Sequence, residues 1–161
     1  MPTDRWEACL AGSGGQGIIS AGIILAEAAV LAGLNAVQTQ SYGPESRGGA
    51  SRAEVVLSTE EIDYAKTTHP DVLLALTVDA CEKYARRTKA GGLLIVDDQI
   101  TPVPDGPYRV IRAPIARIAA SELGRPIVAN IVALGVLAAL TEILPIGALE
   151  EAVLARVPKG T

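Results

Sequence analysis

Aromatic and metal-binding side chains are scarce in this sequence. It has no phenylalanine, one tryptophan and four tyrosines, so alanine, valine, leucine and isoleucine must fill the core. Such cores are typical of tightly layered α/β domains. Two cysteines and one histidine leave neither a disulfide scaffold nor a conventional four-ligand zinc site. We therefore expect no metal to be bound by this chain.

Long hydrophobic runs and excess positive charge are also missing. The longest nearly apolar stretch, residues 127–140, is shorter than the roughly 20 residues that a membrane span needs. The first residues carry Asp4 and Glu7 and no basic segment before an apolar run, so we expect no signal peptide. A net charge of −4 argues against nucleic-acid and anionic-membrane partners. We expect a cytoplasmic protein with no nucleic acid and no membrane as partner.

The 161 residues suit a single domain in which strands alternate with helices. Apolar segments predict strands at residues 6–11, 34–40, 52–58, 72–76, 93–96 and 108–112. Helical spacing predicts helices at residues 18–31, 77–89, 115–123, 127–143 and 146–157. This alternation predicts an α/β fold, namely a three-layer sandwich with a mostly parallel, Rossmann-like sheet, helices on both faces and a helical C-terminal part.

The strand at residues 52–58 has a pattern of its own. Ala53, Val55 and Leu57 alternate with polar residues that include Arg52 and Glu54. A period of two predicts one buried and one solvated face, which favours an antiparallel strand at the edge of the sheet.

Two predicted helices are too apolar to stand in water alone. The helix at 18–31 has Ser20 and Glu27 as its main polar residues, and the stretch 127–140 has only Asn130. A helix that is apolar all round must be buried all round. Either the C-terminal helices cover one another, or they form a permanent interface with another protein, which for the isolated chain includes a homodimer.

A glycine-rich loop, GSGGQG at residues 12–17, joins the first strand to the first helix. It fits the G-x-G-x-x-G pattern through Gly12, Gly14 and Gly17 and also contains Gly15 and Gln16. Glycines here let a ligand approach backbone N–H groups at a helix N-terminus. A dinucleotide site also needs an acidic residue at the end of the second strand, and residues 34–40 have none. A phosphate-bearing ligand and a purely structural role are both left open.

A second distinctive loop, SYGPESRGGA at residues 41–50, follows the second predicted strand. Arg47 supplies a permanent cation, Gly48 and Gly49 free backbone donors, and Tyr42 an amphipathic wall. This combination suits a carboxylate or a phosphate. The alternative is a turn in which Glu45 and Arg47 pair locally.

Together these segments identify a family resemblance. GSGGQG at 12–17 and SYGPESRGGASRAEVVLS at 41–58, with PDVLLAL at 70–76 and ANIVALG at 129–135, closely resemble the γ subunit, or γ-type domain, of the 2-oxoacid:ferredoxin oxidoreductases. The resemblance covers essentially the whole chain as one γ-type domain, 1–161. The segment YGPESRGG looks most like the 2-oxoglutarate branch, with the pyruvate, branched-chain and indolepyruvate branches as alternatives.

The resemblance implies a subunit that carries no cofactor of its own. In such complexes thiamine diphosphate, Mg and iron–sulfur clusters belong to α, β and, where present, δ subunits, and electrons pass to ferredoxin. CoA is the co-substrate, and the γ subunit is expected to shape its approach rather than perform bond chemistry, so the isolated chain should be inactive. The site residues that the resemblance implies are Gly12, Gly14, Gly15, Gln16, Gly17, Tyr42, Gly43, Pro44, Glu45, Arg47, Gly48, Gly49 and Asn130.

Two other functions remain as alternatives: a free-standing Rossmann-like nucleotide-binding protein, and a structural module that binds partners only. Family members usually continue with a further helix, so we expect either a trimmed or a short natural C-terminus. His69, Cys9 and Cys81 have no evident catalytic partner in the sequence. We interpret Asp97 and Asp98, at a strand end, as solvated or helix-capping residues.

Overall fold

The structure is a computed structural model that describes residues 4–13, 17–41, 50–124 and 128–156. Its strands are β1 (Arg5–Ser13), β2 (Asn35–Ser41), β3 (Ala50–Ser58), β4 (Val72–Ala75), β5 (Leu93–Asp97) and β6 (Arg109–Ala113). Its α-helices are α1 (Ile18–Leu31), α2 (Val78–Tyr84), α3 (Ile115–Arg117), α4 (Ala129–Thr141) and α5 (Ile146–Arg156). A 3₁₀ turn follows α2, and a π-helical turn at Ile118–Glu122 extends α3.

The six strands form one sheet in the order β2-β3-β1-β4-β5-β6. Strands β1, β4, β5 and β6 are parallel neighbours, whereas β3 runs antiparallel to both β1 and β2. Five strands therefore point the same way and only β3 is reversed. The predicted three-layer α/β fold with a mostly parallel sheet is confirmed.

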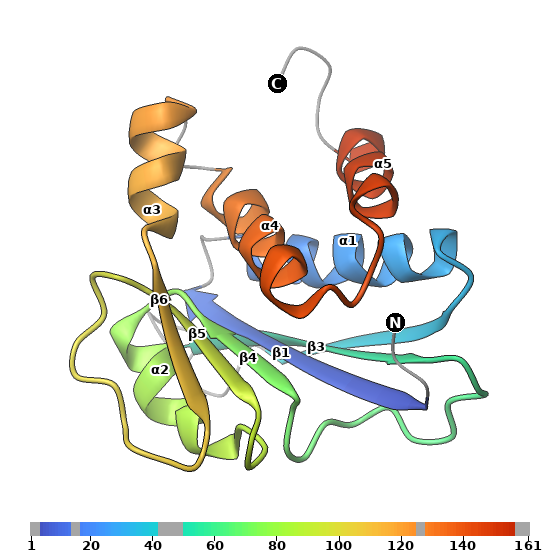
Figure 1. The fold of residues 1–161 in the computed structure, drawn as a ribbon, viewed down its shortest axis with the longest axis horizontal. Coiled ribbons are helices and arrows are strands. Elements are labelled where there is room, and N and C mark those ends of the chain that lie inside the picture. The colour runs from blue at the N-terminus through green and yellow to red at the C-terminus, as the bar shows by residue number, and fades with distance from the viewer. Residues whose placement is uncertain (1–3, 14–16, 42–49, 125–127, 157–161) are drawn as a thin grey trace.

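Helices cover both faces of the sheet (Figure 1). Helices α1, α4 and α5 lie on one face, over a core that includes Leu10, Leu57 and Leu134. Helix α2 lies on the other face, over a smaller core that includes Leu73 and Leu94. Because successive side chains of a strand point to opposite faces, β1 and β4 contribute to both cores.

The prediction for β3 was right in direction and wrong in position. The strand is antiparallel, but it lies between β2 and β1, and β2 forms the edge. Its polar face is also covered: Glu54 is buried, and its Oε1 lies 2.9 Å from Arg52 Nε. The Arg52 guanidinium lies over the ring of Tyr84 from α2, so a helix replaces the expected solvent.

The α-helix observed in this region, α2, is shorter than the helix predicted at 77–89. Thr77 accepts a hydrogen bond from the backbone N–H of Ala80 and caps α2, as a threonine before a helix should. The α-helical hydrogen bonds end at Tyr84, and the remaining turn is 3₁₀.

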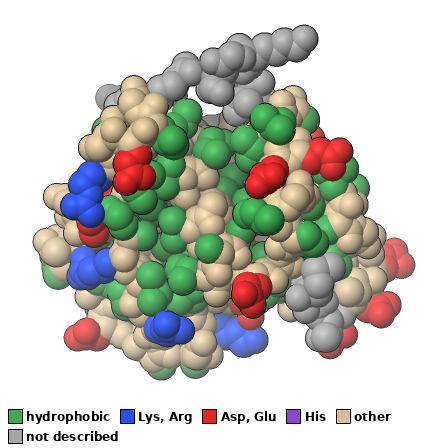
Figure 2. Space-filling model, turned by 45° about the horizontal axis from the view of Figure 1, so that its top comes forward, with side chains coloured by type: hydrophobic (Ala, Val, Ile, Leu, Met, Phe, Trp, Pro, Cys, Tyr) green, Lys and Arg blue, Asp and Glu red, His purple; other side chains and the backbone are tan. Residues whose placement is uncertain are grey.

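The apolar helices partly cover one another. Gly22 brings α1 close to β3, because a Cβ at this glycine would lie 2.7 Å from Ala53 Cβ. Helix α5 packs along α1, where Arg156 Nε lies 2.7 Å from Glu27 Oε1. Hydrophobic side chains nonetheless remain exposed over the middle of this side of the molecule (Figure 2). Packing between the helices thus accounts for part of their apolar surface.

Candidate functional site

The candidate site lies at the carboxyl ends of the parallel strands, at one end of the sheet. From β1 the chain turns into α1 on one face, and from β4 it turns into α2 on the other. Open α/β sheets bind ligands at such a switch point, outside the carboxyl ends of the strands. Strand β3 starts at the same edge, since Ala50 pairs with Ser13 at the end of β1.

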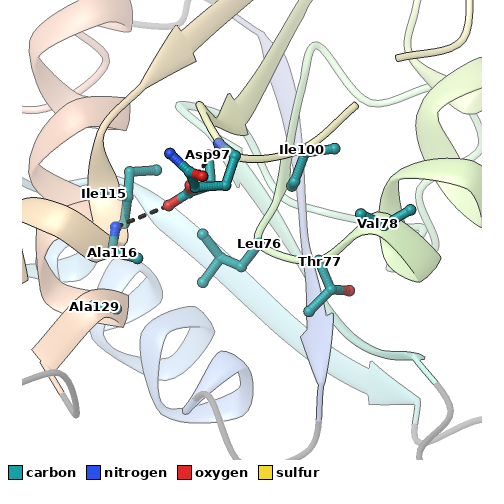
Figure 3. A pocket seen from close by; sticks show the side chains of 9 residues that line it. Leu76, Thr77, Val78, Asp97, Ile100, Ile115, Ala116 and Ala129 are labelled. Carbon is teal, nitrogen blue, oxygen red and sulfur yellow. Dashed lines mark hydrogen bonds between the residues drawn. The ribbon is translucent and has the colours of Figure 1, made fainter. Parts of the chain in front are cut away.

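A crevice of about 260 Å³ opens beside the ends of β4 and β5. Its lining residues come from segments after β4, β5 and β6 and from α4 (Figure 3): Leu76, Thr77, Val78, Asp97, Gln99, Ile100, Ile115, Ala116 and Ala129. The prediction from sequence named none of these residues as site residues. Their only sequence signal is their position just after apolar strands.

Asp97 shapes this crevice by holding two backbone segments. Its Oδ2 accepts a hydrogen bond of 2.8 Å from the backbone N–H of Ala116, at the start of α3, and its Oδ1 accepts one of 3.0 Å from Gln99. Both carboxylate oxygens are thereby used (Figure 3). The interpretation of Asp97 as a capping residue is confirmed, and a metal ligand is not needed to explain its burial.

Gly17 and Asn130 meet across the start of α1, although they are far apart in the sequence. Asn130 Nδ2 donates a hydrogen bond of 3.1 Å to the carbonyl oxygen of Gly17, and Asn130 Oδ1 accepts one from the backbone N–H of Ile131. Gly17 has a φ of +72°, and a Cβ at this position would lie 2.6 Å from Asn130 Nδ2. The asparagine in the apolar helix α4 therefore holds Gly17, and with it the start of α1, against that helix.

Ser51 provides a buried polar atom next to the glycine loop. It pairs with Gly12 in the β1–β3 register, and it points to the same face as Ala53, which lies under α1. Its side chain is almost fully buried, yet its Oγ has no hydrogen-bond partner among the described residues. A buried hydroxyl of this kind is rare in proteins and suits a ligand or ordered water.

Only part of the predicted site can be placed. Gly12 lies in β1, and Gly17 and Asn130 are in contact as described above. The remaining predicted site residues lie outside the described residues: Gly14, Gly15, Gln16, Tyr42, Gly43, Pro44, Glu45, Arg47, Gly48 and Gly49. Their flanking residues Ser13, Ser41 and Ala50 all lie at this edge of the sheet.

The cysteines and the histidine, for which the sequence indicates no catalytic partner, lie in environments that do not activate them. Cys9 is fully buried in β1, and burial, with the nearby charge of Glu54, raises the pKa of its thiol to about 12. Burial also raises the pKa of Cys81. His69 is exposed, with its Nδ1 3.2 Å from the carbonyl oxygen of Arg87. Neither thiol is poised as a nucleophile, because the thiolate is the reactive form.

Across the described residues, no group of three or more histidine, cysteine, aspartate or glutamate side chains is arranged to hold a metal ion. Within the same part of the chain, no helix has the length and apolar character that crossing a membrane requires. The carboxyl end of the sheet brings together the starts of α1 and α2, Gly12 and Gly17, and the hydroxyl of Ser51, which has no partner among the described residues. This arrangement is suited to binding and positioning a ligand.

Comparison with known proteins agrees with this geometry. Residues 7–161 match the family described as pyruvate ferredoxin/flavodoxin oxidoreductase. A curated relative, the 2-oxoglutarate synthase subunit KorC of Methanocaldococcus jannaschii, is 49% identical over 98% of this chain and 86% of its own length.

Two solved structures share the fold. The γ subunit of a keto/oxoacid ferredoxin oxidoreductase from Geobacter sulfurreducens is 49% identical, with a TM-score of 0.87 over 96% of this chain and 88% of its own. The 2-oxoglutarate:ferredoxin oxidoreductase from Magnetococcus marinus, solved with 2-oxoglutarate, coenzyme A and succinyl-CoA bound, is 26% identical. Its TM-score is 0.84 over 96% of this chain, which corresponds to 27% of the longer Magnetococcus chain. The chain belongs to the pyruvate ferredoxin/flavodoxin oxidoreductase family, as a γ-type subunit of a 2-oxoacid:ferredoxin oxidoreductase complex.

Proposed function

We propose that this chain is the γ subunit of a 2-oxoglutarate:ferredoxin oxidoreductase. The complex would convert 2-oxoglutarate and CoA into succinyl-CoA and CO2 and pass the two released electrons to ferredoxin. The observation that carries the proposal is the 49% identity to a 2-oxoglutarate synthase subunit across nearly the full length of both chains. At this identity and coverage, the two chains are expected to share their place in the complex.

The proposed role of this chain is to position CoA. The start of α1 offers backbone N–H groups and the positive end of a helix dipole, both of which favour a phosphate. Ser51 Oγ, which has no partner in the part of the chain that the structure describes, adds a hydroxyl at the same end of the sheet. The predicted contribution of Arg47 is a further positive charge. Holding a co-substrate in place lowers the barrier of the reaction without any bond being made by these side chains.

The chain would act only as part of the assembled enzyme. The larger subunits would hold thiamine diphosphate, Mg and the iron–sulfur clusters, which supply the decarboxylation and electron-transfer chemistry. We also propose that residues 1–161 act as one γ-type domain and that the complex is cytoplasmic.

Steady-state kinetics of the assembled complex test the substrate. The complex would be supplied with 2-oxoglutarate, pyruvate, a branched-chain 2-oxoacid or indolepyruvate, with and without CoA, and ferredoxin reduction would be followed. We expect 2-oxoglutarate to give the highest kcat/KM, with strict CoA dependence. A clear preference for another oxoacid would assign the complex to that branch instead.

Two variants test the role in CoA binding. Arg47→Ala and Ser51→Ala should each raise the KM for CoA, about tenfold for the arginine because a charge-assisted hydrogen bond is worth about 1.5–3 kcal/mol. The KM for 2-oxoglutarate should stay unchanged. Arg109→Ala, in the exposed part of β6 away from the loop edge, is the matched control. Unchanged CoA kinetics in both variants would favour the partner-binding module, and tight NAD or FAD binding by the isolated chain would favour a free-standing nucleotide-binding protein.

A further inference from the structure

The two edges of the sheet differ in how they are protected. Strand β6 carries Arg109 and Arg112 and follows a segment rich in proline. Strand β2, NAVQTQS, has neither a charged residue nor a proline in its seven residues. Natural proteins protect exposed strand edges with charge, proline or covering elements, because an unprotected edge pairs readily with another chain. By this criterion β2 is an edge that is open to pairing.

An apolar groove lies directly beside this edge. It has a volume of about 380 Å³ and is lined by residues of α1, β2 and α5: Ala26, Glu27, Val30, Leu31, Ala36, Ala152 and Ala155. Val30 is 61% exposed and Leu31 is 52% exposed, although both belong to a helix that is otherwise largely buried. Exposed apolar patches next to one another mark interaction surfaces.

The edge and the groove together select an extended occupant. Ala36 belongs to β2 and also lines the groove, so a chain paired with β2 passes along the groove. Alternate side chains of a strand point to the same face of a sheet. A strand added to β2 would therefore turn every second side chain toward the face of the sheet on which the groove lies, with Val30 and Leu31 at one end of it. This is the geometry of strand addition, in which backbone hydrogen bonds give affinity and side-chain pockets give specificity.

The charges around this surface favour a basic partner over a second copy of this chain. Glu27 lines the groove, Glu151 lies one helical turn before Ala155 of the lining, and the carbonyl oxygen of Glu60 accepts a hydrogen bond from Asn35 in β2. Arg156 is the base that faces them, and it is already paired with Glu27. Because Glu27 is paired with Arg156, the net negative charge beside the groove comes from Glu151 on α5, which a partner with lysine or arginine beside its strand would complement and a second copy would not.

We propose that β2 and the α1/α5 groove bind an extended segment of a larger subunit of the complex, with apolar residues at alternate positions and basic residues beside them. A domain of similar fold makes up 27% of the longer Magnetococcus chain, so this fold also occurs within a larger polypeptide. The proposal rests on membership in a multi-subunit complex and is independent of the role in CoA binding. The experiment below measures assembly of the complex, whereas the KM for CoA measures the proposed role in CoA binding. The two proposals can therefore fail separately.

Matched variants test this surface in the assembled complex. Val37→Lys places a charge on the β2 edge, and Val110→Lys makes the same change on β6, where the valine is 38% exposed. Leu31→Glu charges the groove, and Leu123→Glu makes the same change at a leucine beyond α3 that is 54% exposed. Each chain would be produced with the larger subunits, and its affinity for them would be measured. We expect Val37→Lys and Leu31→Glu each to weaken assembly at least tenfold, with little effect from either control.

Two direct readouts identify the occupant. Hydrogen exchange at residues 35–41 should slow on assembly, while exchange at 109–113 should not change. A photo-crosslinking residue at position 30 should capture an extended, alternately apolar segment of a larger subunit. Crosslinking to a second copy, exchange at β2 that does not change, or assembly that tolerates Val37→Lys and Leu31→Glu as well as it tolerates the controls would overturn the proposal. None of these results bears on the KM for CoA of Arg47→Ala, which tests the role in CoA binding separately.

Discussion

Gly17 combines two constraints that can be separated by substitution. Its φ of +72° is unfavourable for other residues, and its missing Cβ leaves room for Asn130 Nδ2. Gly33 has a similar φ of +88°, but no atom lies within 4 Å of where its Cβ would be. The two glycines therefore share the backbone constraint and differ in the steric one.

We expect Gly17→Ala to lower the free energy of unfolding by about 2–3 kcal/mol and Gly33→Ala by about 1 kcal/mol, as backbone strain alone predicts for the latter. Urea denaturation of each variant would measure both values. Adding Asn130→Ala to Gly17→Ala should recover part of the loss, because the clash is removed. Equal losses for the two single glycine variants would show that Asn130 imposes no steric constraint.

Cys9 predicts a specific pH dependence of stability. Burial raises the pKa of its thiol to about 12 in the folded chain, from 9.0 in the unfolded chain. Above pH 9 the unfolded state loses this proton while the folded state keeps it, so stability falls as the pH rises. Between about pH 9 and 10.5 the loss from this group should reach about 1.5 kcal/mol.

Comparison with Cys9→Ala isolates that contribution, because lysines and tyrosines titrate in both proteins. Unfolding free energies measured from pH 8 to 10.5 should decline less steeply in the variant. The native thiols should also resist alkylation at pH 8, since both cysteines are buried. Rapid labelling of the folded protein would contradict the environment described for Cys9.

At the scale of single elements, the helices that start at the crevice depend on side-chain caps. Asp97 accepts a hydrogen bond from the start of α3, and Thr77 accepts one at the start of α2. Replacing a capping residue with alanine typically costs about 1 kcal/mol, with a range of about 0.5–2 kcal/mol. We expect Asp97→Ala to cost more than Thr77→Ala, because it removes two hydrogen bonds to backbone N–H groups, those of Ala116 and Gln99, rather than one. Thermal unfolding of both variants measures the difference, and an equal shift in Tm would argue against the second bond of Asp97.

The polar face of β3 is stabilised by Thr67, which lies 13 residues after Glu54 in the sequence. Glu54 Oε2 accepts hydrogen bonds from the backbone N–H and the hydroxyl group of Thr67, and Oε1 faces Arg52. Glu54→Leu should lower the unfolding free energy by about 3 kcal/mol, because it leaves buried partners without a charge to bind. Glu54→Gln should cost less, since one amide oxygen still accepts. Equilibrium denaturation distinguishes them, and an unaffected Glu54→Leu protein would mean that the network contributes no stability.

The elements show why a sequence pattern predicts some features and misses others. The start and end of α1 coincide with the prediction, because Gly17 and the turn at Gly33 are local signals. The alternation in β3 is also local, but what covers its polar face is not. Tyr84 and Thr67 reach that face only after the sheet has formed. A pattern of period two cannot distinguish a solvated face from one covered by another polar element.

The same limit applies to the site. Asn130 stands out in the sequence as an amide in an apolar helix, and the structure explains it through Gly17. The crevice lined by Leu76, Asp97 and Ile115 has no comparable signal, because three separate strand ends create it. Loop motifs can be found in a sequence, whereas the space between loops depends on strand order.

For the whole molecule, surface charge makes a prediction about assembly. The chain has a net charge of −4, and α5, which lines the groove beside β2, carries Glu150 and Glu151. Association with a basic partner should be accelerated by electrostatic attraction, which salt screens over about 10 Å at 0.1 M and about 3 Å at 1 M. We expect the association rate constant with the larger subunits to fall as NaCl is raised, with a smaller change in the dissociation rate. Stopped-flow or surface-binding kinetics would measure both, and a salt-independent association rate would show that the surface charges do not guide assembly.

The reversed direction of β3 has a consequence for how this family diversifies. Because β3 runs against β1 and β2, the last residue of β2, Ser41, and the first residue of β3, Ala50, lie at the same end of neighbouring strands. A parallel β3 would have required a helical crossover there. A connection between neighbouring antiparallel strands tolerates changes of length more readily than a helical crossover does, so we expect the sequence between Ser41 and Ala50 to be replaceable while β2 and β3 keep their register. Transplanting it between branches of the family is a way to retune the approach to the active site without redesigning the scaffold.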